Sequence, residues 1–77
     1  MPLAHYQLGS LLLEIGQTPR AIDELEAAQR LLPEEPKIYF ALGKAYARAH
    51  RKEDAERARA TFERLNKKEE GNERIKR

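Results

Sequence analysis

The chain contains no cysteine among its 77 residues. Without thiols it has neither disulfide bonds nor a metal site built on cysteine, and their absence fits a reducing compartment. The two histidines, His5 and His50, are too far apart in the sequence to form a pair at metal-ligand spacing. We therefore expect a cytoplasmic protein that binds no metal and uses no cofactor.

Long apolar runs are also absent. The longest, Leu11–Leu13, ends at Glu14, whereas a membrane-spanning helix needs ~20 mostly apolar residues. The first residues have neither the basic start nor the cleavage site of a secretory signal. We expect no membrane partner.

Residues suited to catalysis are few and scattered. Ser10 is the one serine, and no histidine or carboxylate is arranged to activate it. The four glycines do not cluster into a phosphate-binding loop. Carboxylates at Glu53, Asp54 and Glu56 suit the dipole of a helix start better than an acid/base pair. The sequence therefore predicts a protein that is not an enzyme.

The abundant residues, Ala, Leu, Glu and Arg, favour helices throughout. The sequence also repeats itself at an offset of about 34 residues, a period typical of a solenoid, whose units cannot bury their apolar faces alone. The recurring pairs are Pro2 and Pro36, Leu8 and Leu42, Gly9 and Gly43, Ala21 and Ala55, Arg30 and Arg64, Leu31 and Leu65, and Glu35 and Glu69. We predict an all-α fold, an α-solenoid of two helix–turn–helix hairpins.

Proline, glycine and apolar spacing predict four helices. They run from Pro2 to Gly16, from an N-cap at Thr18 to Pro33, from Pro36 to about His50, and from about Glu53 to about Gly71. We assign residues 2–35 to the first repeat, 36–69 to the second repeat with a C-terminal capping helix, and 70–77 to a polar tail. Because residues 69–77 are too polar to offset the entropy of ordering, we expect them to be frayed or disordered.

These residues resemble the tetratricopeptide repeat (TPR), a helix–turn–helix of the same period with a Leu-Gly pair, a following Tyr, and Ala, Phe and Pro further on. The first unit has His5, Leu8, Gly9, Leu12, Ala21, Leu25, Ala28 and Pro33, and the second has Tyr39, Leu42, Gly43, Tyr46, Ala55, Arg59 and Phe62. The resemblance covers roughly residues 2–68. It implies that Gly9 and Gly43 lie where two helices cross, opposite Ala21 and Ala55, and that Leu8 and Leu12 fill the space around the first crossing.

Some positions depart from the family pattern. His5 replaces a bulky apolar residue, and we interpret it as partly exposed rather than as a ligand or proton shuttle. His50 stands where the first turn has Gly16; histidine can adopt a left-handed turn at some cost, so we expect the second hairpin to be looser. Arg59 replaces an apolar residue, and Lys67 replaces the closing proline, which leaves the last helix without a stop.

In TPR arrays the first helix of each repeat lines a concave groove that receives peptides. By this resemblance the groove residues are Leu3, Tyr6, Ser10, Leu13, Lys37, Phe40, Lys44 and Ala47. Tyr6 and Phe40 are equivalent positions, expected to form an aromatic pair, and the lysines add positive charge. The resemblance thus implies a protein–protein interaction module whose partner carries apolar anchors and acidic residues.

The first helix carries more apolar residues than one hairpin can bury: Leu3, Tyr6, Leu11, Leu12, Leu13 and Ile15. So small a chain is also marginally stable by itself. We therefore expect either the C-terminal part of a longer repeat array, ended by a polar fourth helix, or a homo-oligomer formed through the first helix.

Charge is distributed unevenly along the chain. Residues 1–35 have a net charge of −4, from two arginines and six acidic residues, and residues 36–77 have +6, from 13 basic and seven acidic residues. This bias favours head-to-tail pairing of the two ends or steering of acidic partners to the second half. A third alternative is binding to nucleic acid or an anionic surface, but acidic residues interleave the basic ones and argue against a coherent basic stripe.

Overall fold

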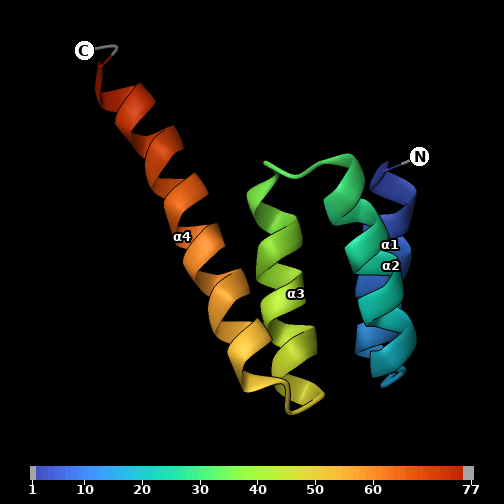
Figure 1. Cartoon of the computed structure of the whole chain (residues 1–77). Coiled ribbons are helices and arrows are strands. Elements are labelled where there is room, and N and C mark those ends of the chain that lie inside the picture. The colour runs from blue at the N-terminus through green and yellow to red at the C-terminus, as the bar shows by residue number, and fades with distance from the viewer. Residues whose placement is uncertain (1, 76–77) are drawn as a thin grey trace.

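The fold is a row of four helices, seen in a computed structural model that describes residues 2–75 of the backbone and the side chains of residues 3–67. The helices are α1 (Pro2–Glu14), α2 (Thr18–Leu31), α3 (Pro36–Arg48) and α4 (Lys52–Ile75). α1 packs against α2 and α3 against α4, and α3 lies between α4 and the α1/α2 pair (Figure 1). This arrangement confirms the prediction of two tandem helical hairpins. No helix in the described part combines the length and apolarity that crossing a bilayer requires.

The two hairpins share one backbone geometry at their turns. The amide of Gln17 donates to the carbonyl of Leu12 at 2.8 Å, and at the equivalent place in the second repeat the amide of Arg51 donates to that of Tyr46 at 2.9 Å. Gly16 has a φ of 87° and its counterpart His50 a φ of 62°. His50 therefore adopts the left-handed conformation that the sequence analysis allowed for it, and this conformation costs about 1 kcal/mol relative to glycine.

These turns also correct two predicted helix starts. The N-cap of α2 is Gln17, without a side-chain capping bond, so Thr18 is already helical. The carbonyl of Gln17 accepts the amide of Ala21 at 2.9 Å, which starts the helix one residue earlier than predicted. The same bond between Arg51 and Ala55 starts α4 at Lys52.

The end of α4 differs from the expected tail. The helix continues to Ile75, so the backbone of residues 69–75 is helical. Straight-chain Lys, Glu and Arg lose little side-chain freedom in a helix, and no proline follows Leu65 to stop it. Residues 76 and 77 of the predicted tail lie outside the described residues.

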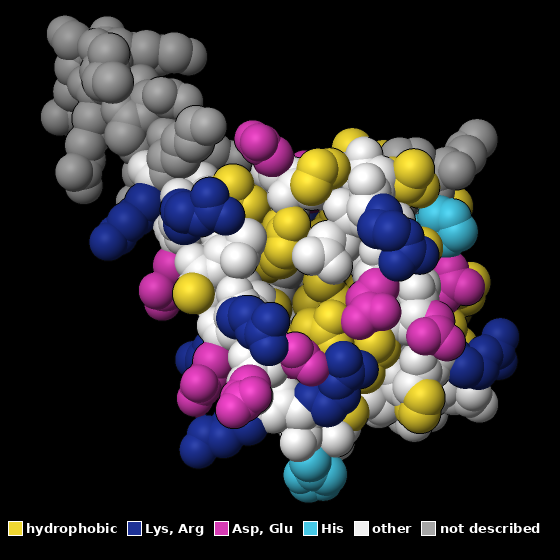
Figure 2. All heavy atoms as spheres, viewed as in Figure 1, with side chains coloured by type: hydrophobic (Ala, Val, Ile, Leu, Met, Phe, Trp, Pro, Cys, Tyr) yellow, Lys and Arg dark blue, Asp and Glu magenta, His cyan; other side chains and the backbone are white. Residues whose placement is uncertain are grey.

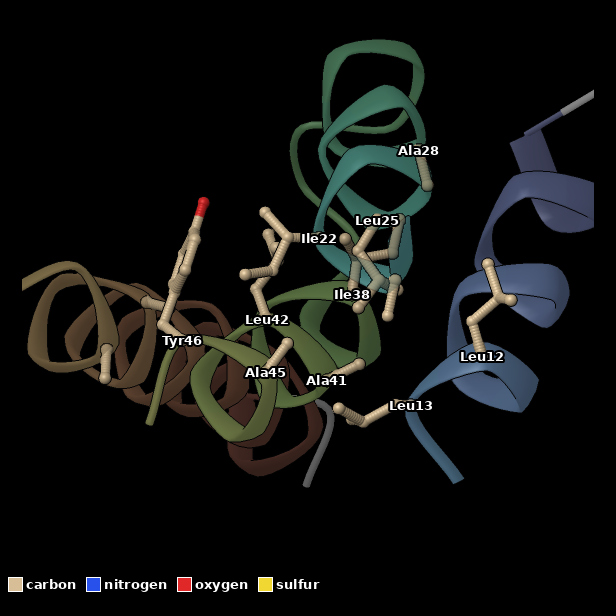
Figure 3. Packing of buried hydrophobic residues seen from close by; sticks show 13 residues of the cluster. Leu12, Leu13, Ile22, Leu25, Ala28, Ile38, Ala41, Leu42, Ala45 and Tyr46 are labelled. Atoms are coloured by element: carbon tan, nitrogen blue, oxygen red, sulfur yellow. The ribbon is translucent and has the colours of Figure 1, made fainter. Parts of the chain in front are cut away.

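The core forms where α3 sits in the angle between α1 and α2. Leu25, Ile38 and Leu42 are its largest fully buried side chains, and Figure 3 shows them meeting between α2 and α3. Leu13, predicted to face the groove, is only 4% exposed, whereas Leu8, predicted to fill the helix crossing, is 41% exposed. The prediction for Leu8 was wrong, because the position of α3 leaves the Leu8 side of α1 open, whereas it covers the side that carries Leu13.

The two glycines that recur in the repeat lie at the helix crossings, as the resemblance implied. A Cβ on Gly9 would lie 3.3 Å from the carbonyl oxygen of Ala21, and one on Gly43 would lie 3.9 Å from that of Ala55. Each crossing therefore brings a first helix close to the backbone of its second helix, at equivalent positions of the two repeats.

Tyr46 links α3 to α2. Its hydroxyl donates to Oε2 of Glu26 at 2.6 Å, and the Arg51 guanidinium lies 4.7 Å from its ring centroid. Burial, and then the bond to the Glu26 carboxylate, raise the pKa of Tyr46 above its ordinary value. The folded chain therefore keeps this phenol protonated at pH values where an unfolded chain loses the proton.

Tyr46→Phe is expected to lower the free energy of unfolding at neutral pH by about 1 kcal/mol through loss of this bond. Because the folded pKa is raised, the contribution of Tyr46 is fully present below the ordinary tyrosine value of about 10 and is lost as pH rises above it. The variant should therefore lose less stability between neutral and strongly alkaline pH than the parent. Urea unfolding at a series of pH values measures this, and parallel pH profiles for the two proteins would contradict it.

Candidate peptide-binding surface

The structure brings five of the eight predicted groove residues to one place. Tyr6, Ser10 and Leu13 of α1 line a small pocket together with Phe40 and Lys44 of α3. Lys37 joins them, because its Nζ lies 5.7 Å from the ring centroid of Tyr6. The first helices of the two repeats therefore face each other across this surface, while Leu3 lies exposed outside the pocket.

Arg48 closes one edge of this α1/α3 pocket. Its guanidinium donates to the carbonyl oxygen of Leu13 at 2.8 Å, and it lines the pocket together with Glu14. Leu13 itself is nearly buried and contributes only to the floor. The side chains left accessible are an aromatic ring from each helix and a rim of charged groups.

Phe40 is the most prominent aromatic residue on the surface, with 54% of its area exposed. We expected it to pair with Tyr6, but its ring packs against Phe62 of α4, with centroids 5.4 Å apart and an angle of 48° between the rings. Nζ of Lys44 lies 5.3 Å from the Phe40 centroid. Tyr6 and Phe40 thus each have a lysine ammonium group over one face of the ring, at cation–π distance.

A second pocket, of about 370 Å³, lies between α3 and α4. It is lined by Phe40, Gly43, Lys44, Ala47, Arg59, Phe62 and Glu63. The missing side chain at Gly43 helps to keep it open, because the nearest atom of Arg59 would lie 3.1 Å from a Cβ there. The sequence prediction included Phe40, Lys44 and Ala47 but missed the three residues from α4. Their counterparts in the first repeat are Leu25, Ala28 and Gln29. The family pattern already matched Leu25 to Arg59 and Ala28 to Phe62, and that match was the sequence signal that could have found them.

The basic residues of the second half do not form an uninterrupted stripe. Arg51 and Arg57 both pair with Asp54, at 2.9 and 3.4 Å. On the face shown in Figure 2, acidic and basic side chains are interleaved over α4. This pattern is that of a solvated helix surface, as the sequence indicated.

His5 has a structural role. Its Nδ1 lies 2.8 Å from Oε1 of Glu24, so the side chain ties α1 to α2 while remaining partly exposed. This agrees with the interpretation of His5 as a partly exposed residue.

A family model described as TPR repeat matches residues 9–49, about half of the chain. The chain belongs to the TPR family. The match runs from the glycine at the first helix crossing to the end of α3, and so includes one full repeat period. Neither a curated protein nor a solved structure shows significant similarity to the chain. TPR repeats form a non-catalytic helical scaffold, and membership in this family identifies the chain as a protein–protein interaction module.

Proposed function

We propose that the chain binds a peptide segment with apolar anchors and acidic residues on the face formed by α1 and α3. The observation that carries this proposal is Phe40, an aromatic side chain that lies between two pockets and is more than half exposed. The ammonium group of Lys44 lies over one face of its ring. An exposed aromatic ring gains from covering by an apolar side chain, and aromatic residues are enriched at interface centres.

The charges beside the rings define the partner further. Lys37 lies over Tyr6 and Lys44 over Phe40, and the two lysines are about two helical turns apart along α3. A partner that inserts apolar side chains between the rings brings its own neighbouring residues next to these ammonium groups. Carboxylates complement them and also gain from electrostatic steering toward the basic second half.

The test uses short fluorescein-labelled peptides that place an aromatic or aliphatic residue every third or fourth position and Asp or Glu between them. Fluorescence anisotropy is expected to show saturable binding, with a matched panel carrying Lys in place of Asp and Glu remaining unbound. Phe40→Ala and Lys44→Ala should each weaken binding by at least about fivefold, the loss expected for a residue central to an interface.

Two substitutions of the same type serve as controls away from this face. Leu31→Ala removes an equally exposed apolar side chain from α2, and Lys67→Ala removes an exposed lysine from α4. Both should leave the dissociation constant unchanged. The proposed surface would be ruled out if the acidic and the basic peptides bound equally well. It would also be ruled out if the control variants lost as much peptide affinity as Phe40→Ala and Lys44→Ala. Membership in a longer array and binding to nucleic acid stay predictions.

A further inference from the structure

The geometry points to head-to-tail assembly of this chain, in which the exposed face of α1 of one copy seats in the α3/α4 pocket of the next. This inference goes beyond peptide binding and does not depend on it. It rests on a correspondence within the molecule, because α3 already sits in the same way on α1 and α2.

The first part of the correspondence is the face of α1. Residues Ala4, Leu8, Leu11 and Ile15 are the first-repeat counterparts of Ile38, Leu42, Ala45 and Ala49. In α3 this face is covered: Ile38, Leu42 and Ala45 are buried, and Figure 3 shows Ile38 and Leu42 directed toward α2. In α1 it is open, with Leu11 55% and Ile15 63% exposed. The face of α1 is therefore exposed to solvent, whereas the equivalent face of α3 is buried within the chain.

The second part is the seat. Leu13, Leu25 and Ala28 lie in the core cluster that α1 and α2 share with α3 and are almost fully buried, and Gly9 lies beside Leu25 where α1 crosses α2. Their counterparts, Gly43, Ala47, Arg59 and Phe62, all line the α3/α4 pocket. The pocket of about 370 Å³ at these residues shows that the equivalent seat is unfilled among the described residues.

One pair of facing side chains has the same two residue types inside the chain and in the proposed assembly, but with their sides exchanged. Within the chain, α3 brings Ala45 to a seat that contains Leu13. In the assembly, α1 would bring Leu11 to a seat that contains Ala47. At this position of the interface a leucine and an alanine trade places, so the volume of this one pair is conserved, which is the kind of change that packed interfaces tolerate best.

The distribution of charge favours a second copy of the chain bound head to tail. The α1/α3 pocket holds Ser10 and Glu14 opposite Lys44 and Arg48, and a shift of one repeat places Glu14 of the incoming copy at the Lys44 and Arg48 end of the seat. The contact also joins the half of net charge −4 to the half of net charge +6. A symmetric contact between two α1 faces would instead join two acidic halves, so complementarity favours the head-to-tail arrangement.

The seat is more polar than its counterpart inside the chain. Ile22 of α2 corresponds to Glu56 of α4, and Leu25 corresponds to Arg59. Association between copies is therefore weaker than packing within one copy, and it depends on concentration. A head-to-tail contact does not close on itself at two subunits, so the mass should increase without a plateau at the dimer.

The test uses the full chain and two blocked variants. Leu11→Lys places a charge on the α1 face and leaves the seat intact, whereas Ala47→Glu places a carboxylate opposite Glu14 in the seat and leaves the α1 face intact. Both positions are exposed and helical, and Lys and Glu are good helix formers. Circular dichroism checks that both variants are folded.

Sedimentation velocity is expected to show open-ended association of the parent chain and monomers for each variant alone. An equimolar mixture of the two variants should form a one-to-one dimer, because one supplies a free face and the other a free seat. Leu31→Lys, a charge at an equally exposed leucine of α2, should assemble like the parent. Glu14→Lys should raise the dissociation constant by roughly tenfold, and Glu14→Lys combined with Lys44→Glu should restore it.

A parent chain that remains monomeric at its solubility limit would overturn the inference. Dimers of Ala47→Glu alone would also overturn it, because they would indicate a contact between two α1 faces. A mixture of the two blocked variants that stays monomeric would overturn it as well, because the α1 face would then bind something other than the α3/α4 pocket of a second copy. Leu11 lies outside the proposed peptide surface, so Leu11→Lys should retain peptide affinity. Failure of assembly is thereby distinguished from failure of peptide binding.

Discussion

Leu25→Ala is expected to destabilise the chain more than any other single truncation considered, by about 2–5 kcal/mol. Leu25 has no exposed surface and lies between α1, α2 and α3, where its removal leaves a cavity that three helices would have to close. A domain of this size has a total stability of only about 5–10 kcal/mol. The variant should therefore unfold at much lower urea concentration, or be largely unfolded without denaturant, as measured by circular dichroism.

Leu31→Ala is the matched control for this truncation. It removes the same atoms from the same helix, but Leu31 is 53% exposed, so we expect a change within about 0.5 kcal/mol. If the two variants unfolded at the same urea concentration, the result would contradict the burial of Leu25 between α2 and α3.

Gly9→Ala is expected to have the second-largest effect, a loss of about 1–3 kcal/mol from overpacking. The added Cβ would lie 2.7 and 2.9 Å from Cγ and Cδ2 of Leu25, in addition to its contact with the carbonyl of Ala21. Leu25 is fully buried and cannot move aside without disturbing the core. This clash outweighs the ~1 kcal/mol by which alanine is favoured over glycine inside a helix.

Gly43→Ala provides the comparison at the equivalent crossing. Its Cβ would meet Cγ of Arg59 at 3.1 Å, and the nearest backbone atom is 3.9 Å away. Arg59 is exposed and flexible, so it can give way, and the helical preference for alanine should then prevail. We expect no loss, or a gain of up to about 1 kcal/mol. Urea unfolding of the two variants side by side measures the difference, and equal destabilisation would contradict it.

The overall architecture could be predicted because its signals are local. Prolines at Pro2 and Pro36 mark equivalent helix starts, and Gly16 marks a left-handed turn. Each of these depends on the conformation of one or two residues, which the sequence specifies directly. The constant offset between the repeats then relates the two hairpins without knowledge of any distant contact.

The faces of α1 could not be predicted in the same way. Leu8 and Leu13 are both leucines on one amphipathic helix, and periodicity alone does not say which side is covered. That depends on where α3 lies, and α3 comes from another hairpin. The prediction therefore assigned Leu8 to the interior, although it is 41% exposed, and did not foresee that Leu13 would be nearly buried at the floor of the α1/α3 pocket.

The candidate site was predicted in part for a related reason. Groove residues were sought only on the first helix of each repeat, so Phe62 and Arg59 of α4 were left out. Their pocket exists because two helices meet around Gly43, and such a contact appears only once both helices are placed. Residues 69–75 show the opposite case, since low hydrophobicity suggested disorder where helical propensity prevails.

The shared turn geometry has a consequence for how such a chain can change over evolutionary time. Because the bond from Arg51 to Tyr46 is the second-repeat copy of the bond from Gln17 to Leu12, a duplicated segment of one repeat length carries its own complete turn. A gene that gains or loses such a unit keeps every remaining helix in phase, and the protein lengthens or shortens by whole steps. An insertion of one or two residues inside a helix would instead rotate the residues after it away from their seat, so growth by duplication is a change that this architecture accommodates readily.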